Sequence, residues 1–254
     1  MIDADRQLEL QRACLRVWLV DIGRRSEGAR LFERHGVTGA IVPATPDRSI
    51  PNSATYEGAA GLADALDELA AMHDAAGVRA WTVWVPEHDS EAVAVLERAG
   101  HTFDGKPAAM TLWLADLEAA EIGDLDWDRD ASAPQVGRIN DLAYGFEGSG
   151  FGVAIGTEPA EPPVRLYQAR VDGEVACVLQ TIDAAQDCGV YYVATHPRHR
   201  GRGLATRLMT AALLEARERG CDTSTLQSSP MGYPVYERLG YRSAFRLHLY
   251  ERRK

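Results

Sequence analysis

The sequence predicts a mixed α/β protein of two similar halves, each with a mostly antiparallel sheet and helices on both faces. The first observation is an internal repeat: GLADALDELAA from Gly61 resembles GLATRLMTAAL from Gly203, and VLERAGH (95–101) resembles VYERLGY (235–241), at offsets of 142 and 140 residues. The second is the order of elements, with strands first and then a strand–helix–strand alternation. The third is charge: residues 1–125 carry a net −10, whereas 126–254 are neutral.

These observations predict two domains, over residues 1–120 and 126–254. The first half is expected to contain a helix, two strands, a helix, a strand, a helix and a last strand, at 4–20, 37–44, 53–57, 60–76, 79–85, 89–99 and 108–114. The second half is expected to contain a helix, a hairpin turning at Asp172-Gly173, a strand, a helix, a strand, a short helix and a last strand, at 133–144, 164–182, 188–195, from 203 to near Gly220, 222–227, 233–239 and 245–251.

The helix and turn assignments rest on periodicity and on glycine. Leu62, Leu66 and Leu69 repeat at a spacing that places them on one helix face. Gly77 and Gly220 follow the two repeated helices, and glycine is a common helix stop because it tolerates positive φ. Amphipathic helices with glycine stops also resemble one another by chance, so duplication is the preferred interpretation and chance is the alternative.

Composition excludes several classes of protein. The chain has 254 residues, of which 46% are hydrophobic and 25% charged, so it is expected to fold into a sizeable core. A net charge of −10 disfavours nucleic acid as a partner. No apolar stretch approaches the ~20 residues that span a bilayer, and the first residues are too charged for a secretory signal. The four cysteines lack zinc-ligand spacing, so we expect no metal and a cytoplasmic location.

The segment VYYVATHPRHRGRGLATRLM (190–209) is the most informative. An apolar strand ends at Pro197, and a run of arginines and glycines leads directly into a helix. A helix N-terminus exposes unpaired N–H groups, and glycines let a backbone approach an anion closely. The segment therefore predicts a phosphate or pyrophosphate cradle. A solvated basic turn and a nucleic-acid contact are the alternatives, and the acidic remainder of the chain disfavours the second.

Two signatures resemble those of the GCN5-related N-acetyltransferase (GNAT) family. Pro197-x-x-Arg200-Gly201-x-Gly203-x-Ala205 resembles its acetyl-CoA signature, although Arg198-x-x-Gly201-x-Gly203 also fits formally. SSPMGYPVYERLGYR (228–242) resembles its second signature. The resemblance covers roughly 130–250 well and implies two tandem folds of this kind, with acetyl-CoA as the cosubstrate.

The resemblance also implies roles for individual residues. The backbone of Val193, Ala194 and Thr195 would bind the pantetheine arm, and Ser228 or Ser229 would lie near it. The pyrophosphate would be held by backbone amides, helped by the Arg200 side chain; these amides belong to Gly201, Arg202, Gly203, Leu204, Ala205 and Thr206.

Catalytic roles follow from the same resemblance. Tyr236 occupies the general-acid position and would protonate the departing CoA thiolate; a core aromatic is the alternative. Asp187 lies near the position of the glutamate base used by some relatives, but a solvated turn residue is equally consistent, and other relatives rely on water. Leu96 occupies the position in the first copy of the repeat that Tyr236 occupies in the second. No arginine–glycine run precedes Gly61. The first half is therefore interpreted as a degenerate domain, serving as a pocket wall or pseudo-dimer partner.

The implied activity is transfer of an acetyl group from acetyl-CoA to a primary amine, expected to be that of a small molecule, by direct attack in a ternary complex. A non-catalytic acyl-CoA-binding sensor or scaffold is the competing class. The chain is compatible with a monomer or a homodimer. The acceptor pocket is expected to include the loop 146–163, where Glu147, Glu158 and Glu161 favour a cationic acceptor or are simply solvated.

Overall fold

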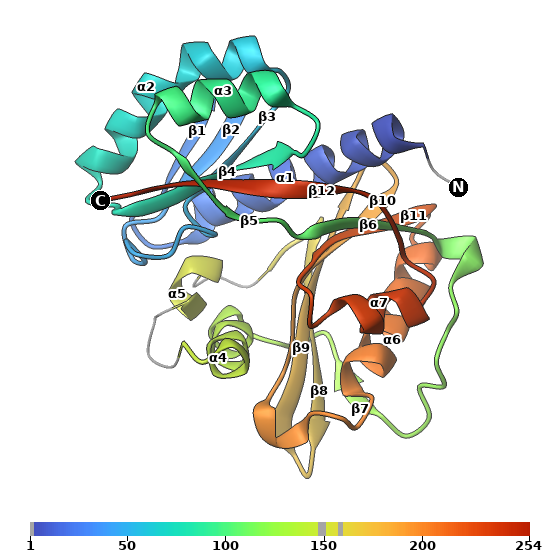
Figure 1. Cartoon of the computed structure of the whole chain (residues 1–254). Helices are drawn as coiled ribbons and strands as arrows, with labels where there is room; N and C mark the ends of the chain where they lie inside the picture. Colours follow the sequence, from blue (N-terminus) through green and yellow to red (C-terminus); the bar gives the residue numbers. More distant parts are fainter. Residues whose placement is uncertain (1–2, 147–150, 157–159) are drawn as a thin grey trace.

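The computed structural model describes residues 3–146, 151–156 and 160–254, and the elements follow the predicted order (Figure 1). The first half contains α1 (Ala4–Arg25), β1 (Arg30–Arg34), β2 (Val37–Ile41), β3 (Ser53–Tyr56), α2 (Ala59–Ala75), β4 (Ala80–Pro86), α3 (Ser90–Arg98), β5 (Thr102–Gly105) and β6 (Ala108–Trp113). The second half contains β7 (Asp126–Asp128), α4 (Ala133–Tyr144), α5 (Phe151–Ile155), β8 (Val164–Val171), β9 (Glu174–Ala184), β10 (Asp187–Thr195), α6 (Leu204–Glu218), β11 (Thr223–Ser228), α7 (Tyr233–Arg238) and β12 (Arg242–Arg253).

The sheets of the two halves join into one continuous sheet. Among the described residues its order is β1-β2-β3-β4-β12-β6-β11-β10-β9-β8-β7, with β5 beside β12. Most neighbouring strands are antiparallel, and the parallel pairs are β3–β4 and β10–β11. A mixed, mostly antiparallel sheet agrees with the predicted fold class. Sequence analysis did not identify the short strands β1, β5 and β7 as separate elements.

The last strand of each half lies in the sheet of the other half. Strand β6 pairs with β11, from Ala108 opposite Ser228 to Trp113 opposite Thr223. The C-terminal part of β12 pairs with β4, from Leu247 opposite Pro86 to Arg253 opposite Ala80. Figure 1 shows β12, drawn in red, running along the first half to the C-terminus. The halves therefore exchange strands, which the repeat in the sequence could not reveal.

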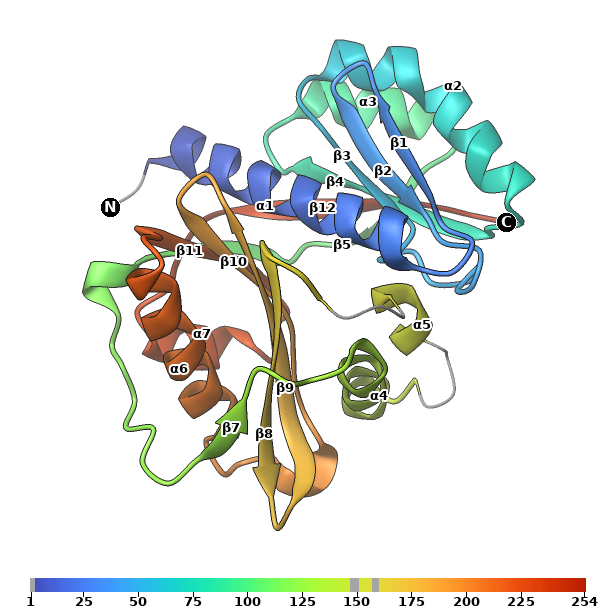
Figure 2. The same ribbon diagram turned by 180° about the vertical axis from the view of Figure 1, so that it is seen from behind.

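Helix α1 also connects the halves. It lies between them in Figure 2, and it packs against β2 and β3 of the first half and against β9 and β10 of the second. The Gln11 side chain amide donates to the Met110 carbonyl at 3.1 Å and to the Leu226 carbonyl at 3.2 Å, on β6 and β11 respectively. These buried bonds satisfy backbone groups of both halves at their junction.

The helices enclose three apolar clusters. Helices α2 and α3 cover the first half around Tyr56, Leu66 and Trp81. Helix α6 packs on β8, β9 and β10 around Leu208 and Leu213, and α4 packs on β9 and β10 from another side. The cluster around Trp18 draws side chains from both halves, including Val42, Val136 and Leu247. The cavity described below opens beside this shared cluster.

Candidate active site

Strands β10 and β11 separate after three paired residues. Asp187, Cys188 and Gly189 pair with Thr223, Ser224 and Thr225, and the ladder stops there. The pairing of β10 with β9 shifts register between Tyr191 and Ala194, and Tyr192 has a positive φ of 55°. A bulge of this kind bends a strand and re-aims its side chains. The family resemblance implies that this strand splays from its neighbour, but the continuous apolar run in the sequence does not predict the bulge.

Two helices hold the bulge in place. Trp18 of α1 stacks on Tyr191, with ring centroids 5.6 Å apart, and its Nε1–H donates to the Tyr192 hydroxyl at 2.7 Å. Asn140 of α4 donates from Nδ2 to the Tyr192 carbonyl at 3.0 Å. The opening between the strands is therefore a packed feature supported from both halves.

A cavity of about 720 Å³ occupies this opening. Its strand side includes Val190, Tyr191 and Val193 of β10, and Leu226, Gln227 and Ser229 on or just after β11. Val193 and Ser229, both predicted from sequence, thus lie at one cavity. Ala194 is buried and Thr195 half-buried at the end of β10, next to this wall. An extended chain between two diverging strands would find backbone hydrogen-bonding groups on both sides.

The loop after β10 ends in an uncapped helix N-terminus. Pro197–His199 form a 3₁₀ turn, and Gly201 and Gly203 have positive φ values of 75° and 72°. Gly203 precedes α6 without any side-chain cap. A Cβ built on Gly201 or Gly203 would meet no atom within 4 Å, so the backbone there faces open space. The predicted residues Leu204, Ala205 and Thr206 form the first turn, whose amides and dipole suit a phosphate.

The arginines of this loop engage protein groups. A guanidinium N–H of Arg200 donates to the Ala143 carbonyl in the last turn of α4. Arg202 contacts His199, with Nη1 and Nδ1 3.2 Å apart, and lines a separate small cavity with Arg207. Both arginines remain exposed beside the helix N-terminus. Arg200 therefore also ties the loop to α4.

Tyr236 of α7 lines the same cavity as Val193 and Ser229. Among the described residues its hydroxyl makes no hydrogen bond, although Tyr241 lies 6.1 Å away, ring centroid to ring centroid. Burial, together with Tyr144 and Cys177, raises the pKa of Tyr236 well above its usual value. The phenol is therefore protonated at neutral pH and can donate a hydrogen bond into the cavity.

Asp187 requires a correction: it does not line the cavity. It is fully buried at the start of β10, where its carboxylate accepts hydrogen bonds from Thr223 Oγ1 at 2.6 Å and Thr225 Oγ1 at 2.5 Å. Cys14 Sγ also contacts it at 3.2 Å. Burial raises the pKa of Asp187. These contacts clamp the paired base of β10 and β11, so we interpret Asp187 as a structural residue and not as a base.

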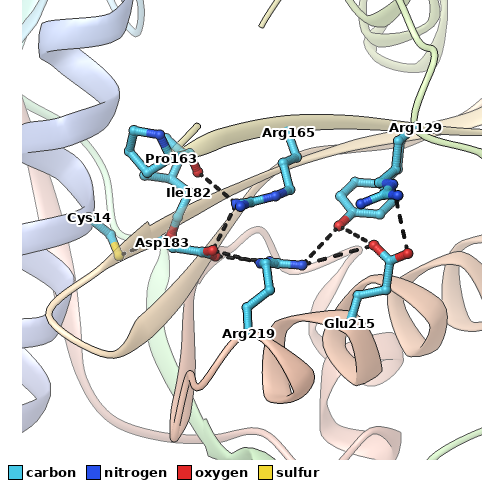
Figure 3. Close-up of polar contacts among 9 residues, drawn as sticks. Cys14, Arg129, Pro163, Arg165, Ile182, Asp183, Glu215 and Arg219 are labelled. Atoms are coloured by element: carbon cyan, nitrogen blue, oxygen red, sulfur yellow. Dashed lines mark hydrogen bonds and ion pairs between the residues drawn. The ribbon is translucent and has the colours of Figure 1, made fainter. Parts of the chain in front are cut away.

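A second polar network fixes α6 against the sheet (Figure 3). The guanidinium of Arg219, just after α6, makes two bonds to the Asp183 carboxylate, at 2.8 and 3.0 Å. Arg165 donates to the same carboxylate at 2.7 Å. Glu215 of α6 accepts from the Tyr167 hydroxyl at 2.9 Å. This network joins the C-terminal part of α6 to β8 and β9. It thereby orients the helix whose N-terminus forms the predicted phosphate cradle.

The first half supplies the opposite wall of the cavity, including Trp18, Arg48, Ile50, Trp84, Lys106 and Pro107. These residues come from α1, the loop before β3, strand β4 and the turn between β5 and β6. Leu96, the counterpart of Tyr236 in the repeat, is fully buried in the α3 core. No local motif marks the wall residues, because only strand exchange and the packing of α1 bring them to the cavity.

Some expectations lie outside the described residues. Glu147 and Glu158 are not described, and Glu161 is exposed and does not line the cavity.

In the described part of the chain, no helix is long and apolar enough to cross a membrane. No group of three or more His, Cys, Asp or Glu suited to a metal occurs among the residues of 3–146, 151–156 and 160–254.

Comparisons with known proteins agree with this geometry. Residues 162–243 match the family model of the acetyltransferase (GNAT) domain. A GCN5-related N-acetyltransferase from Kribbella flavida has a TM-score of 0.68 at 20% identity, with 94% of this chain and 95% of that chain covered. One from Sphaerobacter thermophilus has a TM-score of 0.56 at 14% identity, with 86% and 81% covered. A tandem GNAT protein from the clavulanic acid biosynthesis pathway has a TM-score of 0.56 at 18% identity, with 98% and 95% covered. These structures share the fold across both halves, and a tandem layout is compatible with them.

Proposed function

We propose that this chain, which carries a GNAT-type acetyltransferase domain over residues 162–243, transfers an acetyl group from acetyl-CoA to a primary amine of a small molecule by direct attack in a ternary complex. The domain supports acyl transfer in general; the cosubstrate, the acceptor and the order of events are our proposal. The observation that carries it is the cavity between β10 and β11, which has Tyr236 on one wall, together with the uncapped helix N-terminus that follows the loop after β10.

The fit to acetyl-CoA rests on two features. The diverging strands leave an elongated space in which backbone groups near Val193 can pair with the amides of a pantetheine arm. The open backbone at Gly201 and Gly203 leaves room for a pyrophosphate against the first amides of α6. Acetyl-CoA supplies a thioester whose carbonyl carbon accepts the amine and whose sulfur leaves as a thiolate, while the amine nitrogen releases its proton to water.

The protein residues would act on this reaction by position and by hydrogen bonding. A backbone amide near the bulge at Tyr192 would stabilise the negative charge that develops on the carbonyl oxygen. The Tyr236 hydroxyl would donate its proton, or a hydrogen bond, to sulfur as the carbon–sulfur bond breaks. Because its pKa is raised, Tyr236 is a weak acid, and hydrogen-bond donation is its larger contribution.

The first half would complete the acceptor site. Trp84 and Ile50 face the cavity, so the residues that shape the acceptor come largely from the half that lacks the acetyl-CoA signature. Holding amine and thioester in one closed space makes the attack effectively intramolecular. This accounts for a degenerate half that retains its fold: it is needed as a wall.

The test is a thiol-release assay with acetyl-CoA and a panel of primary amines, together with calorimetry of CoA binding. Amine-dependent thiol release that is lost when Gly203, at the predicted phosphate cradle, is altered supports transfer. CoA binding without thiol release from any amine would instead identify an acyl-CoA-binding sensor.

A further inference from the structure

Three cationic side chains line the acceptor side of the cavity. Arg48 comes from the loop before β3, Lys106 from the turn between β5 and β6, and Arg246 from β12. No aspartate or glutamate lines the cavity among the residues that the structure describes. Three separate segments thus bring positive charge to one space.

Two of these cations are available to a ligand. Arg246 Nη1 donates to the Lys106 carbonyl at 3.2 Å, which keeps the two residues together. Within residues 3–146, 151–156 and 160–254, neither Lys106 nor Arg246 has an ion pair, and both are exposed. Glu87 accepts from the Arg246 backbone N–H at 2.9 Å but does not line the cavity.

Arg48 is held differently. Its Nη1 lies 3.6 Å from an Asp141 carboxylate oxygen of α4, and its guanidinium lies 4.1 Å from the Phe146 ring centroid. Burial lowers the pKa of Arg48, opposed by Asp141. Arg48 therefore adds positive potential and a flat guanidinium surface to the cavity, although Asp141 already balances much of its charge.

The remainder of the acceptor side is apolar. Trp84, Phe151 and Leu249 are buried side chains that face the cavity, and Trp18 closes it beside the bulge. An acceptor that fills this space must present an apolar surface to these side chains. It must also present an anion to Lys106 and Arg246, because two cations that have no ion pair among the described residues favour a negative partner.

We propose that the acceptor is a small amine that carries a carboxylate on an apolar body, such as an apolar or aromatic amino acid; this inference rests on the proposed function. A carboxylate suits the site better than a phosphate. A phosphate dianion costs more free energy to desolvate than a carboxylate, and the attraction of Lys106 and Arg246 does not offset that additional cost. The same cations also disfavour the ammonium form of a nearby amine, which leaves more of it nucleophilic.

The first experiment measures binding without catalysis. Calorimetry on the CoA-saturated protein compares 3-phenylpropanoate with 3-phenylpropanol, which differ in the anion and share the ring. We expect the carboxylate to bind roughly 5- to 10-fold more tightly. Lys106→Met and Arg246→Met should remove this preference, whereas Arg98→Met, an exposed cation at the end of α3 outside the cavity, should retain it. Equal affinity of the two probes overturns the proposal.

The second experiment measures transfer. L-Phenylalanine and phenethylamine share ring and amine, so the ratio of their kcat/KM values reports the carboxylate. We expect phenylalanine to be preferred, and Lys106→Met to lower kcat/KM for phenylalanine more than for phenethylamine, whereas Arg98→Met should leave the ratio of the two values unchanged. A preference for phenethylamine overturns the carboxylate and leaves acetyl transfer intact. A carboxylate preference in binding without thiol release from any amine overturns acetyl transfer and leaves the anion site intact.

Discussion

Gly232 lies directly against the ring of Tyr236. A Cβ built on Gly232 would lie 2.8 Å from Tyr236 Cε2 and 3.3 Å from the Tyr236 hydroxyl oxygen. Contacts under 3.0 Å force one group to move, and the atoms concerned belong to a ring with few rotamers. Gly232 has an ordinary φ of −78°, so the glycine is required by this close approach and not by backbone conformation.

Gly232→Ala should therefore shift Tyr236 and lower kcat with little change in the free energy of unfolding. We expect a loss of about 10-fold, since a displaced donor forfeits much of its effect. Gly58→Ala is the matched control, because a Cβ there meets no atom within 4 Å. Steady-state kinetics and thermal unfolding of both variants check this. An unchanged kcat for Gly232→Ala would contradict a positional role.

Tyr236→Phe should keep the ring packing and remove the hydroxyl. We expect kcat to fall by roughly 10- to 100-fold, at or below the lower end for a general acid, because the raised pKa makes Tyr236 a weak proton donor. KM for acetyl-CoA should change little. Tyr233→Phe, on the same helix and outside the cavity, provides the control. Full kcat for Tyr236→Phe when chemistry limits the rate would make Tyr236 a core aromatic.

Gly203→Asn should weaken CoA binding beyond its effect on stability. Gly203 and Gly220 flank α6, both have positive φ, and neither would bring a Cβ within 4 Å of another atom. Asparagine tolerates this conformation better than other non-glycine residues, so both variants should lose about 1 kcal/mol of stability or less. Only Gly203 lies at the helix N-terminus, so calorimetry should show lower CoA affinity for Gly203→Asn alone. Equal affinities would remove the cradle.

Tyr250→Ala should destabilise the first half although the residue lies near the C-terminus. Tyr250 pairs with Val83 of β4 and packs in the cluster around Tyr56 and Trp81. Loss of this buried ring should cost about 3 kcal/mol. Amide hydrogen exchange should accelerate in β3 and β4 of the native protein. Acceleration confined to 126–254 would show that the halves are energetically separate.

Acid should destabilise the protein through two histidines of the first half. His73 and His101 are buried against Trp81, each with its ring centroid 4.5 Å from that of Trp81; the His73 ring stacks on Trp81 and the His101 ring meets it edge-on. Burial lowers both pKa values from 6.5 to about 4. Below pH 6.5 the unfolded chain therefore binds protons that the folded chain excludes, and stability falls until about pH 4.

The free energy of unfolding should fall by about 3 kcal/mol for each of the two histidine rings. Urea titrations of His101→Phe between pH 7 and pH 4 should show a shallower decline than those of the parent protein, since phenylalanine can keep the edge-on contact with Trp81 without titrating. The same slope for both proteins would contradict this assignment.

The residues that touch only their own neighbours were largely predictable. The helix from Gly203 and the turn at Asp172-Gly173 are specified locally, by periodicity and by residues that accept positive φ. The arginine–glycine run before α6 likewise predicts a phosphate cradle through local backbone chemistry. Tyr236 was found through a signature in sequence, and its hydroxyl faces a cavity that sequence does not display.

Asp187 shows where this reasoning fails. A carboxylate at a strand start fits a catalytic base or a solvated turn equally well, and the sequence contains no sign of Thr223 and Thr225 opposite it. Those partners are 36 and 38 residues away, and pairing of β10 with β11 alone brings them together. Burial and satisfied lone pairs, both tertiary properties, decide its role.

The sequence by itself determined the order of elements, the repeat and the glycine-rich entry to α6, because each depends on interactions within a few residues. The tertiary structure decided that β6 and β12 cross between the halves, that Tyr192 bulges, and that Arg48, Lys106 and Arg246 meet at one cavity. Strand partners and cavity walls depend on contacts between residues far apart in the chain, and an internal repeat gives each strand two equivalent sheets in which to pair.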